Sequence, residues 1–122
     1  MKVVETSKAP GAIGPYSQAY ISGNLIFTSG QLPVDPESGQ LPETIAKQTE
    51  QSCKNVKAIL EAAGSDMSRV IKTTCYLSDI SNFAEFNEIY AMYFPSNPAR
   101  SCFAVKDLPK GALCEIECIA EI

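Results

Sequence analysis

An arginine and a cysteine stand two residues apart in the segment Pro98-Ala99-Arg100-Ser101-Cys102. On an extended strand this spacing puts both side chains on one face. The planar guanidinium of Arg100 can bind a carboxylate at two points, which lysine cannot do with the same geometry. The chain has no histidine to activate the Cys102 thiol, so a small buried side chain is the simpler interpretation of that residue. The pair therefore makes Arg100 the candidate for anion binding, and at Cys102 it favours the backbone groups over the sulfur.

Carboxylates lie in the last segment of the chain. In residues 113–122 apolar side chains alternate with a set that includes Glu115 and Glu117. This pattern predicts a strand with one apolar face and one face that carries carboxylates. A hairpin centred near residues 108–109 would place Arg100 opposite Glu117, and a slip of two residues would place it opposite Glu115. Either register brings a guanidinium and a carboxylate to one face, as an internal ion pair or as a site open to a ligand.

A predicted hairpin earlier in the chain brings two hydroxyl side chains together. Segments 16–22 and 25–30 flank Gly23-Asn24, which supplies the positive φ angles of a tight turn. In the resulting register Tyr16 would face Gln31, and Tyr16 and Ser29 would be diagonal neighbours on one face. Both hydroxyls are then expected to point into the same space.

Two helices are predicted from the spacing of apolar residues. Residues 45–63 carry apolar side chains at intervals of three and four and end at a glycine suited to a left-handed C-terminal cap. Residues 82–94 carry an aromatic stripe, with Asn82 and Glu85 at capping-box spacing. Asn87 falls inside this stripe and needs a hydrogen-bond partner, for which a neighbouring loop is the simplest expectation.

The predicted order of elements is strand, strand, helix, strand, helix, strand, strand, with the third strand at residues 70–77. This order indicates one α+β domain over residues 1–122, in which two helices pack on one face of a mixed sheet. A chain of 122 residues with 45% hydrophobic and 20% charged residues is typical of such a domain.

Composition argues against several classes of function. The five cysteines are odd in number and spread through apolar segments, which indicates reduced thiols. Without histidine, a Cys-x-x-Cys pair or a phosphate-binding loop, neither a metal nor an organic cofactor is expected. The net charge of -4 and the lack of a basic run argue against nucleic acid. No stretch has the length of a membrane span or the apolar core of a signal peptide, so we expect a cytoplasmic protein.

Four motifs occur in one collinear order: Gly14-Pro15-Tyr16-Ser17-Gln18-Ala19, Ile26-Phe27-Thr28-Ser29-Gly30-Gln31, Pro98-Ala99-Arg100-Ser101 and Glu115-Ile116-Glu117. Together they resemble the RidA family (reactive intermediate deaminase, also called YjgF/YER057c/UK114) over essentially the whole chain. The resemblance implies a chorismate-mutase-like fold and a homotrimer with a ligand pocket in each cleft between subunits. It also implies cofactor-independent hydrolysis of enamine and imine intermediates, such as 2-aminoacrylate and 2-iminobutanoate, to 2-oxo acids and ammonia.

The resemblance assigns a role to each matching residue. Arg100 would clamp the substrate carboxylate, and the backbone carbonyl of Cys102 would accept a hydrogen bond from the imine nitrogen. Glu115 would orient and deprotonate the attacking water if partial burial raises its pKa. Glu117 is not at the matching position. The remaining pocket positions of the family are matched by Tyr16, Ser29, Asn87 and the backbone N–H of Gly30.

Two alternative functions remain beside imine hydrolysis. A non-catalytic regulator would bind small 2-oxo acids in the same cleft and signal through a partner protein. RNA cleavage has also been attached to relatives of the family, but this chain offers neither a histidine for acid and base work nor a basic stripe. Imine hydrolysis is the function that the residues favour.

Overall fold

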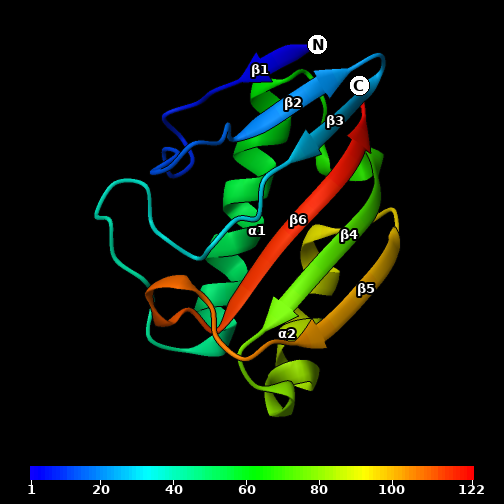
Figure 1. Ribbon diagram of the computed structural model, residues 1–122. Coiled ribbons are helices and arrows are strands. Elements are labelled where there is room, and N and C mark those ends of the chain that lie inside the picture. The colour runs from blue at the N-terminus through cyan, green and yellow to red at the C-terminus, as the bar shows by residue number, and fades with distance from the viewer.

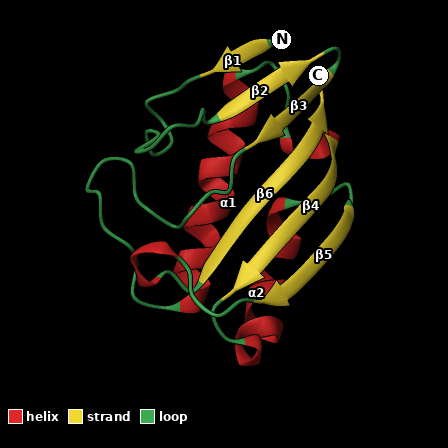
Figure 2. Ribbon diagram, viewed as in Figure 1, coloured by secondary structure: helices red, strands yellow, loops and turns green.

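Two helices lie against one face of a six-stranded mixed sheet in the computed structural model, which describes residues 1–122 (Figure 1). The order of strands across the sheet is β1-β2-β3-β6-β4-β5. The bounds are β1 Lys2–Val4, β2 Ala19–Ser22, β3 Leu25–Thr28, α1 Ile45–Ala62, β4 Val70–Leu77, α2 Phe83–Tyr93, β5 Ala99–Ala104 and β6 Cys114–Glu121. Both helices lie behind the sheet in this view (Figure 2), so the predicted α+β class and the single helical layer are confirmed.

The hairpin of β2 and β3 forms in the predicted register, with Ser22 opposite Leu25 across a turn in which Gly23 has φ +62. Its pairing ends where the Ser29 N–H donates to the Gln18 carbonyl at 2.8 Å. Tyr16 does not continue the strand, because its N–H donates back to the Gly14 carbonyl in a tight bend. The predicted pairing of Tyr16 with Gln31 is therefore wrong.

Strands β5 and β6 do not form the predicted hairpin. Strand β4 lies between them, antiparallel to β6 and parallel to β5 (Figure 1). Helix α2 connects β4 to β5, and such a strand, helix, strand unit places its two strands parallel and adjacent. Segment 105–113 then returns past the end of β4, where the Val105 N–H donates to the Leu77 carbonyl at 2.8 Å.

The two helices begin in different ways. Thr44 caps α1 by accepting a hydrogen bond from the Lys47 N–H at 3.2 Å, and Gly64 with φ +84 follows its end as predicted. Asn82 makes no side-chain cap on α2, so the predicted capping box is wrong. A short 3₁₀ turn, Ile80–Asn82, leads directly into α2, and the Asp79 carboxylate caps that turn instead.

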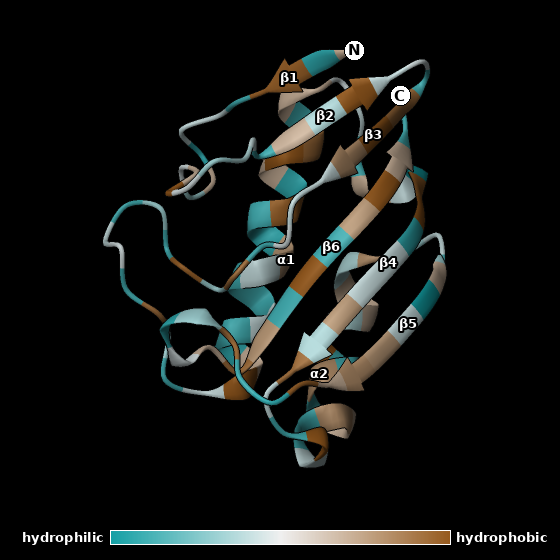
Figure 3. Cartoon of the chain, in the orientation of Figure 1, coloured by the Kyte–Doolittle hydropathy of each residue, from teal (hydrophilic) through white to brown (hydrophobic).

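The hydrophobic core fills the space between the helices and the sheet. Strand β6 contributes alternate residues, which Figure 3 shows as bands of opposite hydropathy along the strand. Four of the five cysteines are buried, Cys102 is partly exposed, and all five thiols are free. The opposite face of the sheet exposes several aromatic side chains, namely Tyr20, Phe27 and Phe103. No helix is long and apolar enough to cross a membrane.

Candidate active site

Helix α2 holds the Arg100 guanidinium at the edge of the sheet. Nη1 of Arg100 donates to Oδ1 of Asn87 at 2.8 Å. The guanidinium carbon lies 4.8 Å from the ring centroid of Tyr90 and 5.6 Å from that of Phe83, within the range of cation–π attraction. The partner of the Asn87 amide is thus an arginine and not a loop, which corrects the expectation from the sequence.

Arg100 forms no ion pair within the chain. The two ion pairs of the structure join Lys47 and Lys54 to Glu50 on α1. A guanidinium carries five N–H donors, and the hydrogen bond to Asn87 is the one that protein groups accept from it. Arg100 is therefore a partly buried cation that is held in place by an amide and two rings and keeps donors available for an anion.

Arg100 and Cys102 share one face of β5, as predicted, but no carboxylate lies on that face of the strands. Their partners on β4 are Thr73 and Cys75, which point toward the helices and are buried. Glu115 is opposite Tyr76 on the other face of the sheet. The expected meeting of guanidinium and carboxylate on one strand pair is wrong, because β4 intervenes and the side chains point to opposite faces.

Glu115 lies against Gly30. An isolated bridge sets this contact, in which the Gln31 N–H donates to the Ile116 carbonyl at 2.7 Å and the Ile116 N–H donates to the Gln31 carbonyl at 3.2 Å. A Cβ added to Gly30 would lie 2.8 Å from Cδ of Glu115 and would overlap Oε2. Glycine at position 30 is thus what allows the backbone and the carboxylate to approach each other this closely.

The two glutamates of β6 differ in their surroundings. Glu117 accepts a hydrogen bond from the Tyr76 hydroxyl at 2.8 Å, whereas no hydrogen bond holds the carboxylate of Glu115. Burial, and to a smaller extent the charge of Glu117, raise the pKa of Glu115 above its ordinary value. A raised pKa is the property that Glu115 would need in order to act as a general base. Glu115 is therefore the more suitable of the two for proton transfer.

Replacement of Gly30 by alanine tests this contact. We expect the Glu115 carboxylate to move toward solvent, because the overlapping atoms belong to the end of a flexible side chain. The pKa of Glu115, measured by carboxyl NMR, should fall toward its ordinary value, and the free energy of unfolding should change by less than about 1 kcal/mol. Gly11→Ala is the control, since nothing lies within 4 Å of a Cβ at that position. An unchanged Glu115 pKa in Gly30→Ala would contradict the contact.

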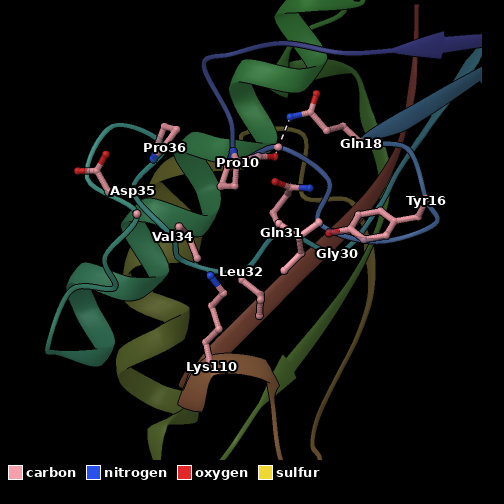
Figure 4. A pocket seen from close by; sticks show the side chains of 13 residues that line it. Pro10, Tyr16, Gln18, Gly30, Gln31, Leu32, Val34, Asp35, Pro36 and Lys110 are labelled. Atoms are coloured by element: carbon pink, nitrogen blue, oxygen red, sulfur yellow. Dashed lines mark hydrogen bonds between the residues drawn. The ribbon is translucent and has the colours of Figure 1, made fainter.

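Tyr16 and Ser29 lie near the same end of β3. The Ser29 hydroxyl donates to the Ser17 carbonyl at 2.6 Å, which ties β3 to the segment that carries Tyr16. Tyr16 is half exposed and lines a cavity of about 210 Å³ together with Gly30 and Gln31 (Figure 4). The segments that carry Tyr16 and Ser29 are thus joined through the 16–18 bend and not through the strand pairing that the sequence suggested.

The structure separates the predicted site residues into two groups. The guanidinium half-site consists of Arg100, Cys102 and Asn87 at the outer strand β5. The carboxylate half-site consists of Glu115, Gly30, Ser29 and Tyr16 around β6 and the end of β3. Since β4 separates β6 from β5, the two strands are about 10 Å apart, and the two side-chain sets lie on opposite faces of the sheet. One chain therefore does not bring all of these residues into one pocket.

Sequence reasoning missed the role of Phe83 and Tyr90. Both were assigned to an aromatic stripe of the core, yet Phe83 is 37% exposed and its ring lies beside Arg100. The signal was present in the spacing, because positions 83, 87 and 90 follow one another by four and three residues and share one helical face. An amide that lies between two aromatic residues on such a face can bind a cation, or it can be a buried amide that hydrogen-bonds to the protein. The sequence is compatible with both.

Comparison with known proteins shows which family this chain resembles. A family model described as "Endoribonuclease L-PSP" matches residues 6–122. The chain is 51% identical over 121 residues to a 2-iminobutanoate/2-iminopropanoate deaminase of Homo sapiens. The alignment covers 98% of this chain and 88% of that protein. It is 52% identical over 123 residues to Reactive Intermediate Deaminase A, chloroplastic, of Arabidopsis thaliana. That alignment covers 99% of this chain and 66% of the Arabidopsis protein.

The fold of this chain also matches solved structures along its whole length. The crystal structure of E. coli TdcF with bound serine superposes with a TM-score of 0.97 at 44% identity and covers 100% of this chain and 99% of that chain. Sequence and fold thus point to the same group of proteins. The chain belongs to the RidA family, also called YjgF.

Proposed function

We propose that this protein hydrolyses enamine and imine intermediates of the 2-aminoacrylate and 2-iminobutanoate type to 2-oxo acids and ammonia. The observation that carries the proposal is the Arg100 guanidinium, which is held by Asn87 and two rings and has no carboxylate partner. The names of the human and Arabidopsis relatives support the same reaction. The substrate has a carboxylate beside its reactive carbon, which suits an arginine clamp.

The first step is binding and orientation of the substrate. The free donors of Arg100 would hold the carboxylate at two points, and the Gly30 N–H would add a further donor. The backbone carbonyl of Cys102 would accept a hydrogen bond from the imine nitrogen and so favour the protonated iminium, which water attacks more readily. Fixing the carboxylate and the nitrogen at once leaves the C=N carbon in one orientation toward water.

The second step is the addition of water. Glu115 would take a proton from a water molecule while the oxygen of that water forms a bond to the C=N carbon. The product of this step is a carbinolamine. Return of that proton to the amino group makes it a leaving group. As the C–N bond breaks and ammonia leaves, the hydroxyl gives its proton to the Glu115 carboxylate and the C=O bond of the 2-oxo acid forms. The raised pKa of Glu115 brings the carboxylate closer to the strength that a base needs near neutral pH.

A direct test generates 2-aminoacrylate in situ with a PLP-dependent dehydratase and follows release of the 2-oxo acid with and without this protein. We expect the protein to accelerate the release. If wild type and Arg100→Ala both leave the rate at that of the dehydratase alone, the proposal is wrong. RNA cleavage, which the name of the family model suggests, would have to persist in Arg100→Ala after stringent purification to be considered.

We also propose that the protein is a homotrimer with its sites in the clefts between subunits. The two half-sites lie on opposite faces of one chain, so a cleft between two chains can combine the guanidinium half-site of one with the carboxylate half-site of the other. Strand β5, which carries Arg100, has an unpaired outer edge, and the sheet exposes Tyr20, Phe27 and Phe103 on the face opposite the helices. These are features that association would cover.

Mixing two inactive variants tests the shared site. Arg100→Ala and Glu115→Gln chains, refolded or expressed together, should regain about a quarter of wild-type activity, because random assembly gives that share of clefts both intact residues. The controls are the Arg100→Ala chains alone and the Glu115→Gln chains alone, prepared in the same way, and both should stay inactive. If the mixture stays inactive although native mass spectrometry shows mixed trimers, Arg100 and Glu115 act from the same chain.

A further inference from the structure

Two of the five cysteines face each other across neighbouring strands. Cys75 on β4 is in register with Cys102 on β5 in the parallel pair. Adjacent strands lie about 4.8 Å apart, which falls within the Cα separation that a disulfide spans. The next pair along, Tyr76 and Phe103, has ring centroids 5.5 Å apart on the other face, so side chains in register meet across these two strands.

The two thiols have different surroundings. Cys75 is fully buried, whereas Cys102 is partly exposed and lies on the same face as Arg100. Interaction with the neighbouring Cys75 thiol and, to a smaller extent, the positive charge of Arg100 lower the pKa of Cys102, while burial opposes them. The Cys75 thiol itself donates to the Thr73 hydroxyl at 4.0 Å. For Cys75, interaction with Cys102 and burial raise the pKa. The exposed member of the pair is therefore the better nucleophile, and the buried member is placed to react with it.

The other three thiols lack this combination. Cys53, Cys114 and Cys118 are buried in the core. Cys114 lies 3.9 Å from the Thr49 hydroxyl and 3.8 Å from the Ser52 hydroxyl, and Cys118 lies 3.9 Å from that of Thr28. Burial raises the pKa of each of the three. Only the pair on β4 and β5 joins a partly exposed thiol to a buried one in strand register.

We propose that Cys102 and Cys75 form an oxidation site, at which a peroxide converts the two thiols into a reversible disulfide within one chain. The Cys102 thiolate attacks one oxygen of hydrogen peroxide, the O–O bond breaks, and a sulfenic acid is formed. The hydroxide that leaves takes up the proton that the Cys102 thiol had lost, which gives one water. The Cys75 sulfur then attacks the Cys102 sulfur, the S–O bond breaks, and the hydroxide leaves with the Cys75 proton as a second water. The two thiols lose two electrons, and the peroxide gains them.

The bond would form beside the proposed substrate clamp. Cys102 is two residues from Arg100 on the same strand face, so linking β5 to β4 there restricts the segment that carries the guanidinium. Formation of the disulfide depends only on the register and environment of the two cysteines. It is therefore independent of the proposed hydrolysis and can be tested without any substrate.

Peptide mapping tests the oxidation site. The full-length protein is treated with hydrogen peroxide, alkylated and digested with trypsin without reductant. Cleavage after Lys72, Arg100 and Lys106 puts Cys75 in peptide 73–100 and Cys102 in peptide 101–106. We expect these two peptides to appear as one linked species, lighter than their sum by two hydrogen atoms, which dithiothreitol separates.

Matched variants identify the partners. Cys53→Ala should still form the linked species, and Cys75→Val should lose it while Cys102 proceeds to sulfinic acid. Three results would overturn the proposal: Cys102 oxidised to sulfinic acid in the wild type with no linked species, a link between Cys53 and Cys114 in its place, or a link that joins two chains on non-reducing electrophoresis. Because the readout is a mass, loss of imine hydrolysis would not affect the outcome.

Discussion

Replacing Arg100 by lysine is expected to lower kcat/KM for imine hydrolysis by about 10²-fold, the equivalent of losing one strong charge-assisted contact. Lysine keeps the positive charge but cannot hold the substrate carboxylate at two points. It also cannot accept the same support from α2, where the Asn87 amide and the Tyr90 ring are arranged around a planar guanidinium. Arg100→Ala removes the charge as well and should cost more.

Coupled assays with dehydratase-generated imine measure this effect. Arg69 is the matched control, because it is the other arginine of the chain and is exposed at the end of the 3₁₀ turn Met67–Arg69. Arg69→Lys should leave kcat/KM unchanged. Full activity of Arg100→Lys, with a thermal midpoint equal to that of the wild type, would refute the two-point clamp.

Replacing Glu115 by glutamine is expected to lower kcat by about 10² to 10⁴-fold, the usual contribution of a positioned base. The affinity for 2-oxobutanoate, measured by calorimetry, should change little, because Arg100 and not Glu115 would bind the carboxylate. This split also separates hydrolysis from the regulator alternative, in which Glu115→Gln would change neither ligand affinity nor any rate.

The pH dependence gives a second readout for Glu115. The base acts when ionised, so kcat/KM of the wild type should fall as the pH drops through the raised pKa of Glu115, and this limb should be absent in Glu115→Gln. The fold favours the protonated carboxyl, so its contribution to stability is present below the unfolded pKa and is lost as the pH rises through the folded pKa. Glu115→Gln should therefore raise Tm at neutral pH and leave it nearly unchanged in acid.

Glu117→Gln is the control for the carboxylate variants. Glutamine can still accept the hydrogen bond from the Tyr76 hydroxyl, so fold and activity should be close to those of the wild type. If Glu117→Gln lost activity to the same degree as Glu115→Gln, the base would not be assigned to Glu115. A lower Tm in Glu115→Gln at neutral pH would contradict the raised pKa.

Local patterns in the sequence were sufficient for most of the individual elements, although the short strand β1 was not predicted. Apolar spacing located α1 within one residue at its C-terminal end, β-branched residues located β4, and Gly23-Asn24 set the register of the first hairpin. Each of these depends on residues close together in the chain. The alternation in 113–122 likewise showed which side chains of β6 are buried.

Partners distant in the chain were harder to predict. The hairpin between β5 and β6 was wrong because alternation reports the two faces of a strand and not its neighbour in the sheet. The unit β4, α2, β5 contained the missing signal, since a helical connection of this kind joins parallel strands. The error moved Arg100 to the wrong face relative to Glu115. The list of site residues came from motifs and did not depend on this pairing, whereas the proximity of Arg100 and Glu115 within one chain did.

The division of the site between two faces of the sheet has a consequence for assays. With Arg100 on the outer strand β5 and Glu115 on the far side of β4, a single chain carries both half-sites but cannot bring them into one pocket. Catalysis and association then share one equilibrium. Specific activity should be constant at high protein concentration and fall on dilution below the dissociation constant of the proposed trimer. At low concentration the protein would thus lose activity per chain as well as in total.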